Sequence, residues 1–162
     1  FAHKLDFHWG QTVDLDDFFR ENPTDGKRKW IVPAYELTYT YTDSSLGISQ
    51  FVLEMHLDKY GQLLKMNFPH LGVQPKTNIC ALRFAVQAAK IHAKKNGFKA
   101  QEYDIDLKYD KFLDSLLWQV SFVQKVDGNM TYYQSVFLDA HSKIVVRSYQ
   151  TMTIVDYRTN AR

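Results

Sequence analysis

The stretch LDKYGQLLKMNF, residues 57–68, is echoed by LDAHSKIVVRSY at residues 138–149. Each copy has a strand-like end at Leu-Asp, a short polar turn, and a second strand-like run that closes on an aromatic residue. An alternating segment precedes each copy, at residues 30–42 before the first and 118–126 before the second. The chain therefore contains two similar β-meanders, and this repeat decides the fold class.

One helix is expected between the two copies. Residues 78–96 are rich in alanine and carry apolar side chains at helical spacing. Thr77 or Asn78 is the predicted N-cap, and Asn96 followed by Gly97 is the predicted end. The order of meander, helix, strand and meander predicts an α+β fold. In it, a curved antiparallel sheet from two related β-meanders has one long helix packed on it.

The 162 residues are expected to form a single domain, 1–162. Its half-units span 30–68 and 78–154, and residues 1–29 form an N-terminal lead-in that includes a short helix near 14–20. A hydrophobic content of 45% and a charged content of 23% are typical of globular proteins. The aromatic content of 15% favours pleated sheet.

Charge and composition argue against several classes of partner. The formal net charge is +2 and no run of five like charges occurs, so no nucleic-acid partner is expected. No apolar stretch of about eighteen residues occurs, so no membrane span is expected. Cys80 is the single cysteine and its neighbours are apolar, which predicts a buried structural thiol. The chain begins at Phe1 rather than Met, which is compatible with removal of a signal peptide. The oligomeric state does not follow from the sequence.

Known catalytic motifs are missing from the sequence, so no enzyme, cofactor or metal site is predicted. The six histidines form neither His-x-His nor His-Glu-x-x-His, and the seven glycines are too scattered to build a phosphate loop. A metal between His56 and His141, which lie near corresponding turns, remains an alternative. Asp104 and Asp106 are interpreted as solvated side chains.

The aspartate of each repeat has a structural interpretation. Asp58 and Asp139 both stand at a strand end, directly before a short polar turn. An aspartate in this position accepts hydrogen bonds from backbone amides of the turn. We therefore expect both residues to form turns rather than to act as acid or base.

Aromatic side chains form the best candidate for a ligand or partner face. Tyr35, Tyr39 and Tyr41 fall on one face of a predicted strand because the period is two, and Tyr132 with Tyr133 adds a second group. Such strips usually belong to a core. On an open face of the sheet, these rings would suit a peptide or an apolar ligand.

The second copy resembles the PepSY and PepSY-like domains of bacterial exported proteins. The matching parts are the alanine-rich helix at 78–96, LWQV at 117–120 and YQSVFLDAHSKIV at 133–145. In that family the last part reads as a strand, Asp-Ala, a small polar turn with glycine, a lysine and an aliphatic pair. Here Ser142 stands where glycine is usual. The resemblance covers about half of the chain, and residues 30–68 look like a partial second unit without a long helix.

The resemblance implies a cystatin-like arrangement, in which a helix packs on a bent antiparallel sheet. It also implies a non-enzymatic binding module of the bacterial cell envelope, periplasmic or secreted, that associates with a peptide, a protease or another envelope protein. A cytoplasmic location is the alternative to export.

Two other functions stay open. A small ligand carrier or an enzyme of the cystatin/NTF2-like superfold would hold a pocket inside the curved sheet. A structural subunit would use an exposed strand edge for β-augmentation. A deep pocket with converging Asp, His or Tyr would favour the carrier or enzyme, and a filled apolar face would favour the module.

Overall fold

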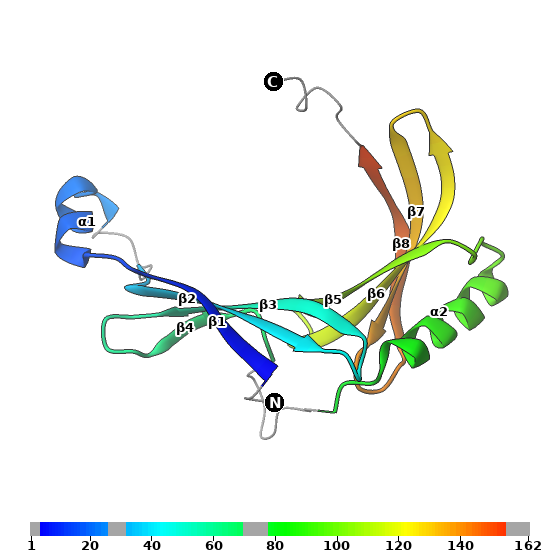
Figure 1. Cartoon of the computed structure of the whole chain (residues 1–162). Coiled ribbons are helices and arrows are strands. Elements are labelled where there is room, and N and C mark those ends of the chain that lie inside the picture. Colours follow the sequence, from blue (N-terminus) through cyan, green and yellow to red (C-terminus); the bar gives the residue numbers. More distant parts are fainter. Residues whose placement is uncertain (1–3, 26–31, 70–77, 155–162) are drawn as a thin grey trace. The chain divides into compact units, whose positions relative to one another are not determined.

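The computed structural model describes residues 4–25, 32–69 and 78–154 (Figure 1). The fold is α+β with antiparallel sheets, as the sequence predicts. The chain divides into two compact units. The N-terminal unit comprises Phe1–Ser44 and Ile48–Pro75, and the C-terminal unit comprises Ser45–Gly47 and Lys76–Arg162. We describe each unit by itself.

The N-terminal unit is a four-stranded antiparallel sheet with the strand order β1-β2-β3-β4. Its elements are β1 (Leu5–Thr12), α1 (Leu15–Glu21), β2 (Tyr35–Asp43), β3 (Ile48–Leu57) and β4 (Leu63–Met66). The predicted alternation of β2 is confirmed, because Tyr35 pairs with Leu57 and Tyr39 pairs with Leu53. Apolar side chains of β2 and β3 therefore share one face of this sheet.

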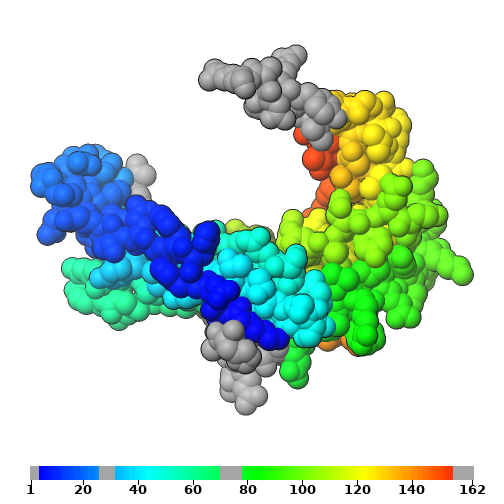
Figure 2. Space-filling model, in the orientation of Figure 1, coloured from blue at the N-terminus to red at the C-terminus, as the bar shows by residue number. Residues whose placement is uncertain are grey.

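The N-terminal residues that we expected as a lead-in contain a strand of this sheet. β1 pairs with β2 along its length and lies at the surface of the unit, in blue in Figure 2. A bulge between Phe7 and Trp9 shifts the register, so Phe7 pairs with Tyr39 but Trp9 pairs with Thr38 and lies on the other face. The helix predicted near 14–20 is α1, and the side chain of Asp14 caps it by accepting hydrogen bonds from two backbone amides.

The C-terminal unit combines one long helix with a second four-stranded antiparallel sheet, in the order β5-β6-β7-β8. Its elements are α2 (Leu82–Asn96), β5 (Tyr103–Asp110), β6 (Ser115–Asp127), β7 (Met130–Asp139) and β8 (Val145–Ile154). Figure 1 shows α2 along one side of this sheet, where it contacts β6, β7 and β8. The two meanders thus build two sheets rather than one, because β1 and β5 each complete a separate hydrogen-bonded ladder.

The core of the C-terminal unit lies between α2 and the sheet. The helix buries a stripe of small side chains and one valine: Ala85, Val86, Ala89 and Ala93. The sheet presents Trp118, Val120 and Phe122, all buried. Trp118 points to the helix side, because its indole Nε1 donates a hydrogen bond to the carbonyl oxygen of Cys80 at 3.0 Å. The apolar face beneath the helix is therefore filled.

The start of α2 differs from the prediction. Asn78 lies before the helix, and Thr77 lies outside the described residues; the N-cap is Ala81, whose side chain makes no capping bond. The amide of Leu82 instead donates to the carbonyl of Leu46 at 2.7 Å, so a turn distant in sequence supplies the acceptor. The predicted end is confirmed, since Gly97 adopts a left-handed conformation with φ of 73°.

Both turn aspartates are confirmed as turn-formers. Asp58 Oδ1 accepts hydrogen bonds from the amides of Tyr60 and Gln62, at 2.8 Å each. Asp139 Oδ1 accepts from the amide of Ser142 at 2.7 Å, and its Oδ2 accepts from the hydroxyl of Ser115 at 2.8 Å. The Asp139 carboxylate thus joins its turn to the start of β6, whereas the Asp58 carboxylate accepts hydrogen bonds only within its own turn.

The two turns differ in length and in the position of their left-handed residue. The amide of Asp58 donates to the carbonyl of Gln62, but the amide of Asp139 donates to the carbonyl of Ile144, one residue further along. The left-handed position is Gly61 in the first turn, with φ of 79°, and Lys143 in the second, with φ of 64°. Lys143, not Ser142, therefore takes the conformation that favours glycine.

Candidate functional site

The five predicted tyrosines lie on two different sheets. Tyr35, Tyr39 and Tyr41 belong to β2 of the N-terminal unit, and Tyr132 and Tyr133 belong to β7 of the C-terminal unit. Successive residues of a strand point to opposite faces. Tyr132 therefore lies on the α2 side of its sheet and Tyr133 on the other side, where it lines a hollow.

Tyr41 is part of the core of the N-terminal unit. Its side chain is buried, and its hydroxyl donates to Asp43 Oδ2 at 3.1 Å. Burial, together with the hydrogen bond to Asp43, raises the pKa of Tyr41 to about 12. Lys4 pairs with the same carboxylate. Tyr35 is exposed, and Tyr39 is half-buried with its ring edge-on to Phe7 at a centroid distance of 5.3 Å.

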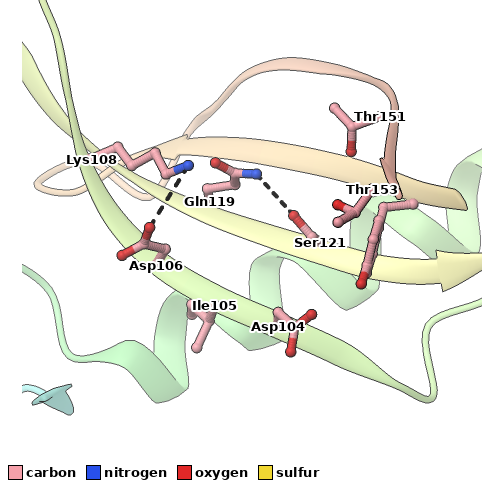
Figure 3. Close-up of a pocket in the computed structure, with 9 residues that line it drawn as sticks. Asp104, Ile105, Asp106, Lys108, Gln119, Ser121, Thr151 and Thr153 are labelled. Atoms are coloured by element: carbon pink, nitrogen blue, oxygen red, sulfur yellow. Dashed lines mark hydrogen bonds and ion pairs between the residues drawn. The ribbon is translucent and has the colours of Figure 1, made fainter. Parts of the chain in front are cut away.

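The face of the C-terminal sheet opposite α2 carries the most concentrated group of polar side chains. We call it the open face and define it by residues of all four strands: Asp104, Asp106, Lys108, Gln119, Ser121, Tyr133, Ser135, Phe137, Arg147, Tyr149, Thr151 and Thr153. Two shallow hollows of about 310 Å³ and 320 Å³ lie on it and share Lys108, Gln119 and Thr151. In Figure 3, Gln119 and Ser121 lie along one strand beside the acidic residues of β5.

A row of hydrogen-bonded side chains crosses the floor of the open face from β6 to β8. Gln119 Nε2 donates to Ser121 Oγ at 3.0 Å, as Figure 3 shows. The hydroxyls of Ser121 and Ser135 lie 2.8 Å apart, and those of Ser135 and Thr151 lie 3.0 Å apart. Ser121 and Ser135 are buried, so their hydroxyls satisfy one another. Gln119 and Thr151 are half-buried, so polar atoms at both ends of the row can reach a ligand.

One end of the open face is aromatic and cationic. Phe137 stacks on Tyr149 with ring centroids 5.0 Å apart, and the Arg147 guanidinium lies 4.8 Å from the Phe137 ring centre. Arg147 also pairs with the buried carboxylate of Asp110 at 2.6 Å. Burial acts to raise the pKa of Asp110, but hydrogen bonds from backbone amides and from Arg147 outweigh it and lower the pKa.

The other end of the open face is acidic. Asp104 and Asp106 project from the edge strand β5 and are exposed. Lys108 Nζ lies 3.7 Å from Asp106 Oδ2, which is a weak exposed ion pair. A basic ligand group would therefore find two carboxylates here and one competing lysine.

The open face offers hydroxyl, amide, aromatic and paired charged groups, which can supply hydrogen bonds, stacking and ion pairing to a ligand. The carboxyl of Asp110, which lines one of the hollows, is held ionised by its partners.

The sequence pattern did not reveal most of this face. Asp104 and Asp106 stood out only as solvated acids, and Gln119, Ser121 and Thr151 gave no motif. Gln119 and Ser121 come from β6, Ser135 from β7 and Thr151 from β8. These side chains meet only because of the register in which the three strands pair. Alternation of Ser121 with buried apolar neighbours is the one local signal that marks the face.

The remaining sequence candidates have other surroundings. His56 Nδ1 lies 3.6 Å from Glu36, and His141 Nδ1 lies 3.0 Å from the carbonyl oxygen of Asn78. In the part of the chain that the structure describes, no three His, Cys, Asp or Glu residues gather into a group that could hold a metal ion. Cys80 is half-buried, and burial raises the pKa of its thiol.

No protein-family model, curated protein or solved structure matches this chain. Among residues 4–25, 32–69 and 78–154, neither helix is long and apolar enough to cross a membrane.

Proposed function

We propose that this protein is a non-enzymatic, PepSY-like binding module, and that the open face of its C-terminal unit binds an extended peptide with basic side chains. The observation that carries the proposal is the polar row of Gln119, Ser121, Ser135 and Thr151, which runs across three strands beside two exposed carboxylates.

An extended peptide fits this surface in both hydrogen bonding and charge. Backbone amides and carbonyls of such a peptide alternate along its length and can pair with Gln119 and Thr151 at the ends of the row. A lysine or arginine of the peptide would lie near Asp104 and Asp106. At the opposite end the exposed ring of Tyr149, which stacks on the buried Phe137, offers a contact for an apolar residue.

The architecture of the C-terminal unit supports the PepSY-like part of the proposal. One helix covers one face of an antiparallel sheet, and the apolar space beneath it is filled by Trp118, Val120 and Phe122. A filled face favours a module over a carrier with an internal pocket. The proposed location in the bacterial envelope, and a protease as one partner, rest on the resemblance of residues 78–96 and 117–145 alone.

A small-ligand carrier is the second candidate function. The hollows of about 310 Å³ and 320 Å³ are at the lower limit of volumes that hold small molecules, roughly 300 Å³. Both are shallow and polar, which favours a peptide that lies across them over an enclosed ligand.

Fluorescence anisotropy with two labelled decapeptides tests the proposal, one of alternating Lys and Ser and one of alternating Glu and Ser. We expect the full chain to bind the lysine peptide, with an affinity that falls as salt rises. Gln119→Ala should weaken binding about fivefold and the double change Asp104→Asn with Asp106→Asn about tenfold. Asp127→Asn is the matched control, because Asp127 is an exposed acid that pairs with Lys125 away from the open face.

The proposal is wrong if neither peptide binds, if both bind equally, or if the control weakens binding as much as the double change. Turnover of a substrate that is lost in the Asp104→Asn and Asp106→Asn protein would also contradict it, because that result would make the face catalytic.

A further inference from the structure

The two sheets place equivalent residues on equivalent faces. In both units the leucine before the turn aspartate pairs with an aromatic residue: Leu57 with Tyr35, and Leu138 with Trp118. Because side chains alternate along a strand, the next residues on the same face also correspond. Tyr35, Leu37 and Tyr39 therefore occupy the places that Trp118, Val120 and Phe122 hold in the C-terminal unit.

That face is sealed in the C-terminal unit and only partly covered in the N-terminal unit. In the N-terminal unit Tyr41, Phe51 and Leu53 are buried, whereas the end of the face around Tyr35 is exposed. In the C-terminal unit, Trp118 is 2% exposed and Phe122 is 0% exposed beneath α2. In the N-terminal unit, Tyr35 is 37%, Phe7 is 60% and Leu63 is 44% exposed. Phe7 pairs with Tyr39 and Leu63 pairs with Leu57, so these exposed groups lie on one face of the sheet.

No helix of the described N-terminal residues seals this surface. The helix of that unit, α1, is two turns long and contributes no buried residue. We call the surface the apolar face and define it by side chains of all four strands: Phe7, Tyr35, Leu37, Tyr39, Met55 and Leu63. None of these residues is charged, so the face offers contact to an apolar surface and no partner for an ion.

The C-terminal unit shows what kind of element covers such a face. α2 approaches its sheet through Ala85, Ala89 and Ala93, each 0% exposed and spaced four residues apart. Small side chains at this spacing let the helix backbone come close to large aromatic residues below it. The exposed side of α2 carries charged residues such as Lys90 and Lys94, together with Phe84 and Ile91.

We propose that the apolar face of the N-terminal unit is a docking site for an amphipathic helix of a partner protein, with a stripe of small residues at four-residue spacing. The partner helix lies where α2 lies on the other sheet, covers Tyr35 and Phe7, and turns its charged side to solvent. This site is separate from the open face, so it does not depend on the proposed peptide function.

A synthetic peptide of residues 78–98 is the probe, since it carries the stripe in a sequence already known to fit the equivalent face. It is titrated into the full chain while amide signals are followed by nitrogen-15 NMR. We expect saturable shifts in β1, β2 and β3 at peptide concentrations below about 1 mM. A peptide with Ala89→Glu should fail to bind, because its stripe then carries a charge.

Variants of the full chain locate the site. Tyr35→Asp and Leu63→Lys should each weaken binding at least about tenfold. Two variants are used so that the test still holds if one of them unfolds the sheet. Tyr60→Asp is the matched control, because Tyr60 is 76% exposed in the first turn, outside the apolar face. It should leave the affinity unchanged.

Three results would overturn the proposal. The first is an absence of shifts up to about 1 mM peptide. The second is binding that Tyr35→Asp and Leu63→Lys leave intact, or shifts confined to the C-terminal unit, where the peptide would be replacing α2. The third is a dimer in sedimentation that Tyr35→Asp converts to a monomer, which would assign the face to a second copy of this chain.

Discussion

The N-terminal and C-terminal sheets use the same pattern of strands and turns, yet they treat the same face differently. In the C-terminal sheet, Trp118 and Phe122 lie under α2 and are withdrawn from water. In the N-terminal sheet, Tyr35 and Tyr39 take the equivalent places, and Tyr35 is exposed while Tyr39 is half-buried. An alternating aromatic strand therefore does not by itself define a core, because the element packed on it decides whether the rings are structural or available for binding.

The same comparison applies to the opposite faces. The C-terminal sheet places buried serines in a hydrogen-bonded row on the side away from its helix. The N-terminal sheet carries Glu36, Thr38 and Thr40 on the corresponding side. Recognition is thus expected on the polar face of one sheet and on the apolar face of the other.

The largest expected difference concerns the covered and uncovered aromatic residues. Trp118→Ala should cost about 3–5 kcal/mol of the free energy of unfolding, because it leaves a cavity under α2 and removes the bond to Cys80. Tyr35→Ala should cost less than about 1 kcal/mol, because its ring is already partly in water. Urea unfolding followed by circular dichroism measures both. Equal losses would show that the apolar face is covered in solution.

A second, smaller difference is expected at the turn aspartates. Burial acts to raise the pKa of Asp139, but hydrogen bonds from Ser142, Ser115 and His141 outweigh it and lower the pKa to about 2. A folded-state pKa below the unfolded value of about 3.9 stabilises the fold at higher pH. This stabilisation is complete above about pH 4 to 5 and is lost as the pH falls through the folded value.

Replacement of these aspartates tests that difference. Asp139→Asn should cost about 2 kcal/mol at pH 7 and flatten the loss of stability between pH 4 and pH 2, since the titrating group is gone. Asp58→Asn should cost about 1 kcal/mol, because that carboxylate bonds only within its turn. Urea unfolding at a series of pH values is the measurement. A larger loss for Asp58→Asn would reverse our ranking of the two turns.

The smallest effect is expected at the left-handed turn position. Lys143→Gly should raise the free energy of unfolding by about 0.5 kcal/mol, since glycine adopts a φ of 64° without steric cost. The gain is limited because Lys143 Nζ lies 4.6 Å from the centre of the Phe84 ring, and that cation–π contact would be lost. The change Lys143→Met keeps the backbone strain and removes the charge, so it should lower stability slightly.

The fold class was predictable from local patterns. Alternation in β2, the aspartates at the strand ends and the glycine at the end of α2 each reflect the chemistry of a few neighbouring residues. The start of α2 was not predictable, because its acceptor is the Leu46 carbonyl from a distant turn and no capping side chain marks it. The pairing of β1 was not predictable either, since its bulge places Phe7 and Trp9 on opposite faces although they are two residues apart.

The candidate site was less predictable than the fold. Tyr133 was selected as an aromatic residue, but its neighbour Tyr132 faces the other side of the same strand, and Tyr41 is buried against Asp43. Ser135 and Thr151 lie beside each other only because β7 and β8 pair in a particular register, which a bulge between Phe137 and Leu138 shifts. Such a register depends on the packing of the whole sheet, and a single sequence does not encode it locally.

The turn at residues 45–47 determines where this chain can be cut. A fragment that begins at Lys76 would leave the Leu46 carbonyl behind, and the first amide of α2 would lose its acceptor. Gly47 lies so close to Leu82 that an added Cβ would be 2.7 Å from the Leu82 Cβ, so the contact tolerates only glycine. The start of α2 in the second repeat therefore depends on residues 45–47, which are synthesised before the first repeat is complete. A protein designed to contain only the second repeat would have to include these three residues.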